Sequence, residues 1–163
     1  MTATFPMPAP VAETNIMKPA QRKILLVDDD PGVRQILHRL LMEEDYLVFS
    51  AANGAEALKL ADTTQVDLVL LDLNMPVKNG WETFEQFSIK NPLLPIILIT
   101  ARSNQFFPAL AAGIGALMEK PLDFVKLFHT IQNLLDEPED VRLARSLGRP
   151  AAFHHIPPNT GNP

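Results

Sequence analysis

The sequence of 163 residues contains no cysteine, which excludes disulfide bonds and cysteine-ligated metal sites. Long apolar runs are absent as well. The longest, residues 93–101, is interrupted by Pro95, whereas a membrane-spanning helix needs about 18 apolar residues in a row. The first twenty residues lack the basic start and apolar core of a secretory signal. We therefore expect a cytoplasmic protein without a membrane span.

Basic residues are outnumbered by acidic ones. The chain has 14 Lys and Arg residues against 19 Asp and Glu residues, a net charge of −5 and a pI near 5.3. Because nucleic-acid-binding domains usually carry a basic patch, we expect no direct nucleic-acid binding. Hydrophobic residues make up 47% of the chain and the mean hydropathy is +0.05, which is typical of a chain that buries one globular core.

Nine of the fifteen prolines lie near the two ends of the chain and divide it into three parts. Residues 1–21 are rich in Pro and Ala without apolar periodicity, which predicts a disordered N-terminal tail. Residues 22–137 are predicted to form the folded domain. Residues 138–163 are predicted to be a Pro-rich C-terminal tail, in which residues 140–147 are compatible with a short helix.

Strand-like and helical patterns alternate within residues 22–137. Runs rich in Ile, Leu and Val predict buried strands at 24–27, 66–71 and 96–99, and weaker signals predict strands at 46–51 and 116–118. Apolar residues at helical spacing predict four helices between or after them. These residues are Val33, Ile36, Leu37, Leu40 and Leu41; Ala57, Leu58 and Ala61; Trp81, Phe84 and Phe87; and Phe124, Leu127, Phe128, Ile131, Leu134 and Leu135. With a fifth helix after residue 100, the alternation is typical of an α/β fold with an open parallel sheet.

The ends of three helices can be predicted from single residues. Asp30 and Asp123 are predicted N-caps, because their carboxylates can accept hydrogen bonds from the free N–H groups of a first turn. Pro108 predicts a shortened or displaced helix after residue 100, since proline is accommodated only in a first turn. Phe106 and Phe107 are adjacent on this helix, so only one of them is expected to face the core.

Polar residues stand at the carboxyl ends of the predicted strands. The first strand runs into residues 28–30 (DDD), the third into Asp72, the fourth into Thr100 and the fifth into Lys120. In open parallel sheets, ligands bind beyond these strand ends. Carboxylates that lie close together repel each other unless a cation lies between them, and oxygen ligands suit Mg²⁺. The pattern predicts a metal-assisted phosphoryl site.

These residues together resemble the receiver domain of two-component response regulators. The resemblance is carried by four motifs in order, namely residues 24–30 (ILLVDDD), residues 72–76 (DLNMP) followed by Gly80, Thr100–Ala101 and Lys120–Pro121. It covers about residues 23–135. It implies a flavodoxin-like receiver fold, which is a doubly wound, five-stranded parallel sheet with strand order 2-1-3-4-5.

The resemblance also implies a metal site and a nucleophile. Asp72 would be the phosphoacceptor, which takes a phosphoryl group from a sensor histidine kinase or a phosphotransfer protein. Mg²⁺ would be held by Asp29 directly, by Asp28 mainly through water, by Asp72 and by the backbone carbonyl of Asn74.

Further residues are implied to contact the phosphoryl group. Lys120 would neutralise its oxygens, and a cis Lys120–Pro121 peptide would direct this lysine. Thr100 and the backbone N–H of Ala101 would bind the phosphate, and Thr100 would move toward it as a switch. Leu117 occupies the second switch position, which is usually aromatic in receivers, so the output mechanism is expected to differ here.

The function that follows is a single-domain response regulator, because about 26 residues after Glu137 are too few for a helix-turn-helix output domain. It would catalyse its own phosphorylation and slow dephosphorylation without being an enzyme in the usual sense. Output would be binding of an unknown downstream protein effector or relay of the phosphoryl group; the sequence favours neither.

Two alternatives remain open at this point. One is a receiver-type interaction module that works without phosphorylation. The presence of all the motif residues argues against it, whereas Leu117 and Pro108 keep it open. The other is a hydrolase of the haloacid dehalogenase type, suggested by Asp28-x-Asp30, although that family has its nucleophile on the first strand and a cap insertion for which this chain has no room.

Overall fold

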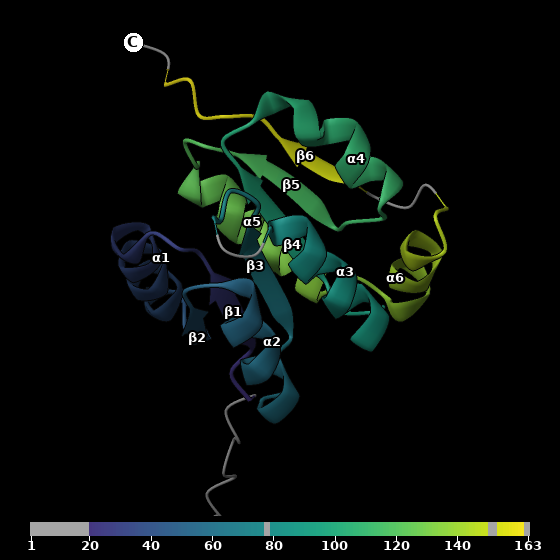
Figure 1. Cartoon of the computed structure of the whole chain (residues 1–163), viewed down its shortest axis with the longest axis horizontal. Coiled ribbons are helices and arrows are strands. Elements are labelled where there is room, and N and C mark those ends of the chain that lie inside the picture. Colours follow the sequence, from purple (N-terminus) through teal and green to yellow (C-terminus); the bar gives the residue numbers. More distant parts are fainter. Residues whose placement is uncertain (1–19, 77–78, 150–152, 162–163) are drawn as a thin grey trace, which may run out of the picture.

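The computed structural model describes residues 20–76, 79–149 and 153–161, and its strands form one parallel sheet in the order β2-β1-β3-β4-β5-β6 (Figure 1). The strands are β1 (Lys23–Val27), β2 (Leu47–Ala51), β3 (Leu68–Asp72), β4 (Ile96–Thr100), β5 (Ala116–Glu119) and β6 (His154–Ile156). All five pairings are parallel. The predicted parallel sheet is confirmed, but the predicted number of five strands is wrong.

The helices cover both faces of this sheet. They are α1 (Pro31–Glu43), α2 (Gly54–Thr63), α3 (Gly80–Lys90), α4 (Phe106–Ala111), α5 (Phe124–Leu135) and α6 (Glu139–Ser146), with a short 3-10 helix, η1 (Ser103–Gln105), before α4. Alternate strand residues enter two separate hydrophobic clusters, one completed by α1 and α5 and the other by α2, α3 and α4. This doubly wound arrangement buries the central strands on both faces, as their continuous apolar sequences predict.

The predicted caps are present, but two of the predicted core residues are exposed. Asp30 accepts hydrogen bonds from the N–H groups of Gly32 and Val33, and Asp123 accepts one from that of Lys126. Ile36 is 49% exposed, because α1 packs through Leu37 and Leu41 and Ile36 lies beside this stripe. Phe124 is 40% exposed, because it is the first residue of α5, immediately after the cap.

The sixth strand comes from residues that the sequence predicts to be a tail. Helix α6 agrees with the short helix expected at 140–147, and β6 then pairs with β5, with His154 opposite Ala116 and Ile156 opposite Met118. Three residues are too few to show a strand periodicity, and prolines at 157 and 158 end the strand because they cannot donate to a ladder. The predicted N-terminal tail lies almost entirely outside the described residues.

Helix α4 is short, as Pro108 predicts. It spans six residues, and Pro108 stands in its first turn. Phe106 is half-buried against the core and Phe107 is 76% exposed, so only one of the two faces inward, as expected. Among the described residues no helix has the length and apolar character needed to cross a membrane.

Candidate functional site

Three carboxylates meet at the carboxyl edge of the sheet, where β1 and β3 lie side by side. The register pairs Val27 with Leu71, so the next residues, Asp28 and Asp72, are neighbours across the two strands. One ligand atom each of Asp28, Asp29 and Asp72 lies within 4.8 Å of the others. Asp28 and Asp72 are buried and Asp29 is exposed. The structure therefore brings the three predicted acidic metal ligands together.

Asp28 is the least solvated of these carboxylates. Its Oδ1 accepts a hydrogen bond of 2.9 Å from the backbone N–H of Asp30, whereas Oδ2 is buried and accepts no hydrogen bond from the described residues. Burial raises the pKa of Asp28; the Asp30 N–H and Lys120 oppose this rise, while Asp72 and Asp29 add to it. A buried carboxylate oxygen without a donor is suited to a cation.

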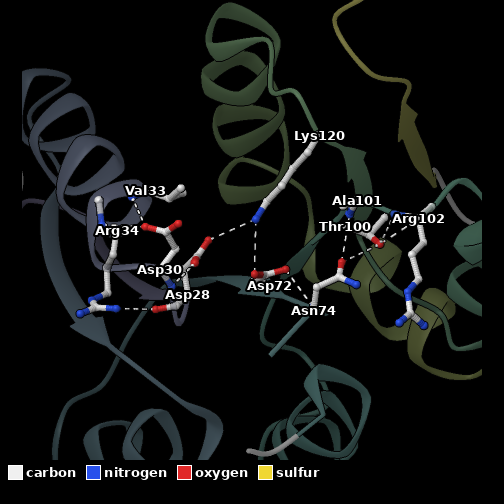
Figure 2. A network of polar contacts seen from close by, with 11 residues as sticks. Asp28, Asp30, Val33, Arg34, Asp72, Asn74, Thr100, Ala101, Arg102 and Lys120 are labelled. Carbon is white, nitrogen blue, oxygen red and sulfur yellow. Dashed lines mark hydrogen bonds and ion pairs between the residues drawn. The ribbon is translucent and has the colours of Figure 1, made fainter. Parts of the chain in front are cut away.

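Lys120 places its ammonium group between the two buried carboxylates (Figure 2). Its Nζ lies 3.3 Å from Oδ2 of Asp72 and 3.5 Å from Oδ2 of Asp28. The other oxygen of Asp72, Oδ1, accepts a hydrogen bond of 2.9 Å from the backbone N–H of Asn74. The Lys120–Pro121 peptide is cis, as the resemblance implies. Lys120 is thus in ion-pair contact with the predicted phosphoacceptor.

Thr100 and Ala101 lie on the far side of Asp72, and both donate to the side chain of Asn74 (Figure 2). Thr100 Oγ1 donates to Asn74 Oδ1 over 3.2 Å, and the Ala101 N–H donates to the same oxygen over 3.0 Å. The two predicted phosphate donors are therefore together but already engaged. From the sequence, a role is predicted only for the backbone carbonyl of Asn74, so this role of its side-chain amide was not predicted. The sole sequence signal was an amide side chain two residues after Asp72.

The start of α3 packs closely against the end of β3, which carries Asp72. Gly80 begins α3, and a Cβ atom there would lie 2.5 Å from the backbone oxygen of Asp72 and 2.6 Å from Cα of Leu73. Only glycine therefore lets α3 start against the end of β3. A cavity of about 380 Å³ opens next to Asn74 and Thr100 and is also lined by Trp81, whose indole N–H donates to Gln105.

The donor set fits Mg²⁺. All side-chain ligands are carboxylate oxygens, two of them buried, and the cluster includes Asp28, whose Oδ2 accepts no hydrogen bond from the described residues and lies 3.5 Å from Lys120 Nζ. Asp30 is adjacent in sequence, but its carboxylate caps α1. This use of Asp30 does not support the dehalogenase-type interpretation of Asp28-x-Asp30.

The second predicted switch residue, Leu117, is fully buried in β5. It pairs with Leu98 of β4 and with His155 of β6, and it belongs to the cluster against which Phe106 and Phe153 pack. It therefore lies beneath the α4 side of the sheet, two residues before Glu119, and its role as a switch stays a prediction.

Comparisons with known proteins agree with this geometry. A family model described as the response regulator receiver domain matches residues 24–132. Transcriptional regulatory protein GlrR of Escherichia coli is 35% identical over 122 residues, which are 74% of this chain and 27% of GlrR. Sporulation initiation phosphotransferase F of Bacillus subtilis is 32% identical over 115 residues, which are 69% of this chain and 93% of that protein. The chain thus spans about a quarter of one relative and nearly all of the other.

Solved structures give the same result. A CheY-like receiver domain protein from Methanospirillum hungatei matches with a TM-score of 0.70 and 28% identity, over 74% of this chain and 98% of that chain. Response regulator TrrA from Thermotoga maritima, in complex with Mg²⁺-BeF, matches with a TM-score of 0.66 and 34% identity, over 70% and 99%. TrrA is also known in complex with the histidine kinase ThkA.

Proposed function

Since the chain belongs to the response regulator receiver domain family, we propose that Asp72 accepts a phosphoryl group at the site described above. The observation that carries this proposal is the position of Lys120. Its ammonium group lies 3.3 Å from Oδ2 of Asp72 and 3.5 Å from Oδ2 of Asp28. This oxygen of Asp28 is buried and accepts no hydrogen bond from any residue that the structure describes. This is the arrangement that a phosphoryl group and a divalent cation would complete.

In the proposed reaction, a carboxylate oxygen of Asp72 bonds to phosphorus while the bond from phosphorus to an imidazole nitrogen of the donor breaks. The products are an aspartyl phosphate and a free histidine, which takes up a proton from solvent. The buried position of Asp72 orients the nucleophile, and its hydrogen bond from the Asn74 N–H keeps the carboxylate in place. Lys120 neutralises charge on the transferred oxygens.

Receiver domains bind Mg²⁺ at an acidic pocket, and we assign Mg²⁺ here to Asp28, Asp29, Asp72 and the backbone carbonyl of Asn74. When bound, the ion supplies positive charge opposite the phosphoryl oxygens. Thr100 Oγ1 and the Ala101 N–H then change acceptor, from Asn74 Oδ1 to a phosphoryl oxygen. We propose that phosphorylation acts on the loop between β4 and α4 through this exchange of acceptors.

The phosphodonor is proposed to be a sensor histidine kinase or a phosphotransfer protein. TrrA forms a complex with a histidine kinase, and one relative is a sporulation phosphotransferase, which supports a partner of this class. The output is proposed to be contact with a downstream protein effector or relay of the phosphoryl group. That the receiver acts alone stays a prediction of the sequence, since the relatives include proteins of which it is only 27%.

The test is incubation of the purified protein with acetyl phosphate and Mg²⁺, followed by intact-protein mass spectrometry. We expect a one-phosphate increase in wild type that is absent in Asp72→Asn and absent when EDTA removes Mg²⁺. Asp62→Asn is the matched control, because this carboxylate is exposed and pairs with Lys90 far from the site. Phosphate on Asp72→Asn would reject Asp72 as the acceptor. An unmodified wild type would favour the phosphorylation-independent interaction module.

A further inference from the structure

The C-terminal segment, residues 153–159, runs along the edge of β5 that faces away from β4, toward Lys120. β6 covers the edge of β5 from Ala116 to Met118, and in Figure 1 it lies next to β5 under α4. Two prolines then end the ladder before it reaches Glu119. The segment nevertheless contacts the chain beyond Met118, the last paired residue of β5, through one side chain of β6 and one backbone hydrogen bond after it.

These two contacts stand on either side of Lys120. His155 Nε2 lies 2.8 Å from Oε1 of Glu119, the residue before Lys120. The backbone N–H of Asn159 donates over 2.9 Å to the carbonyl of Pro121, the residue after it. On the opposite side, the backbone N–H of Lys120 donates over 2.8 Å to the carbonyl of Thr100. The backbone that carries Lys120 is therefore held from both β4 and the C-terminal segment.

From this placement we infer that the C-terminal segment positions Lys120 for phosphoryl transfer, with His155 as the principal positioning residue. The inference rests on the proposed function. A lysine side chain has four rotatable bonds, so its ammonium group stays at one place only if the backbone beneath it is fixed. A shift of about 1 Å in a group that must meet a transferred phosphoryl can cost up to about a hundredfold in rate.

His155 is itself well anchored. Its ring packs edge-on against the ring of Phe106 in α4, with centroids 5.0 Å apart. Phe153 also packs edge-on against the ring of Phe106, at 5.6 Å. The side chain of Glu119 is only 11% exposed, and His155 is its one side-chain hydrogen-bond partner among the described residues. Loss of the imidazole would leave a poorly solvated carboxylate next to Lys120. The segment thus joins α4 to the two residues on either side of Lys120.

The experiment compares rates of phosphorylation by acetyl phosphate in wild type, His155→Ala and His154→Ala. We expect phosphorylation of His155→Ala to be about tenfold slower than that of wild type. This loss is smaller than the roughly hundredfold cost of a full 1 Å shift of the ammonium group. His154→Ala is the matched control, because it removes the neighbouring imidazole, for which no side-chain bond is found within the described residues, while keeping the backbone pairing of β6. Mg²⁺ affinity, titrated by Trp81 fluorescence, is expected to be unchanged, since Lys120 and His155 are not ligands.

A double-mutant cycle separates positioning from general destabilisation. In a Lys120→Ala background, His155→Ala is expected to cause no further loss of rate, because the group that it positions is gone. His155→Gln, which keeps an N–H donor for Glu119, is expected to restore most of the rate and serves if His155→Ala does not fold. The inference is overturned if His155→Ala matches His154→Ala, if the loss persists without Lys120, or if His155→Gln fails to restore it. An unphosphorylated wild type would instead reject the proposed function, and this inference with it.

Discussion

Replacing Asp28 with asparagine is expected to stabilise the Mg²⁺-free protein. The carboxylate is 1% exposed, and its burial raises the pKa of Asp28. A carboxyl whose pKa is raised by folding lowers the stability of the folded state at pH values where it is ionised. Asparagine keeps an acceptor for the Asp30 N–H, 2.9 Å from Oδ1, and removes the charge.

The size of the effect follows from three opposing terms. At an effective dielectric constant of about 20, Lys120 at 3.5 Å contributes about 4.7 kcal/mol of attraction, and Asp72, within 4.8 Å, at least about 3.5 kcal/mol of repulsion. Desolvation of the buried ion costs several kcal/mol more. The sum favours the neutral side chain by about 2 kcal/mol, and part of this is lost because an amide N–H₂ group would face Lys120. We expect a gain of about 1–2 kcal/mol, or about 3 °C in Tm per kcal/mol.

The same substitution is expected to remove the stabilisation by Mg²⁺. An ion that binds only the folded state adds about 1.4 kcal/mol at ten times its Kd, and Asp28→Asn should lack most of this gain. The stability advantage of Asp28→Asn should also depend on pH. It should be present at neutral pH and vanish as the pH falls through the raised pKa toward the ordinary value of 3.8, where the wild-type carboxyl is neutral too.

Thermal and urea unfolding measure these differences, with EDTA or with saturating Mg²⁺, for wild type, Asp28→Asn and Asp62→Asn. The exposed Asp62 controls for the loss of one negative charge anywhere on this acidic protein. If Asp28→Asn unfolds more easily than wild type in EDTA at neutral pH, then the attraction to Lys120 exceeds repulsion and desolvation, and the reasoning is refuted.

Three further substitutions test the surroundings of the site. Gly80→Ala should cost about 1–3 kcal/mol in unfolding and slow phosphorylation, because its Cβ would meet backbone 2.5 Å away. Gly161→Ala should change neither, because a Cβ there would meet no described residue within 4 Å apart from its chain neighbours. Asn74→Ala should lower the free energy of unfolding by about 1–2 kcal/mol, since two donors lose their acceptor. Arg145→Ala should lower the free energy of unfolding by about 3–5 kcal/mol, because it leaves the buried Glu137 carboxylate without the two 2.6 Å hydrogen bonds that Arg145 donates to it. A smaller loss in unfolding experiments would show that α6 is only loosely attached.

The main features of the site could be predicted because they follow from strand ends. A continuous apolar run identifies a buried strand, and the residue after it must lie at the edge of the sheet. Asp28, Asp72 and Lys120 are each placed in this way, and the register of β1 and β3 brings the two carboxylates together. The N-cap role of Asp30 was predictable for a similar reason, since it depends only on neighbouring residues.

Features that depend on side-chain direction or on very short elements were not predictable. Ile36 fits the helical repeat of α1, but the repeat does not tell how wide a stripe the sheet covers. The amide of Asn74 reaches Thr100 and Ala101 across a gap between two strand ends, and no spacing in the sequence records this distance. Strand β6 has three residues, and it is the unpaired edge of β5 that makes them a strand.

The sixth strand also changes what Leu117 can do. In a five-stranded sheet β5 would be an edge strand, and a side chain on it could move between core and solvent beside α4. Here β6 pairs with that edge, and Phe153 and His155 pack on Phe106 above it, so Leu117 is enclosed on all sides. We therefore expect a signal from Thr100 to reach the α4 surface through Phe106 and the C-terminal segment, and not through Leu117. Because His155 contacts both Phe106 and Glu119, we expect the path to the α4 surface and the proposed support of Lys120 to depend on the same residue.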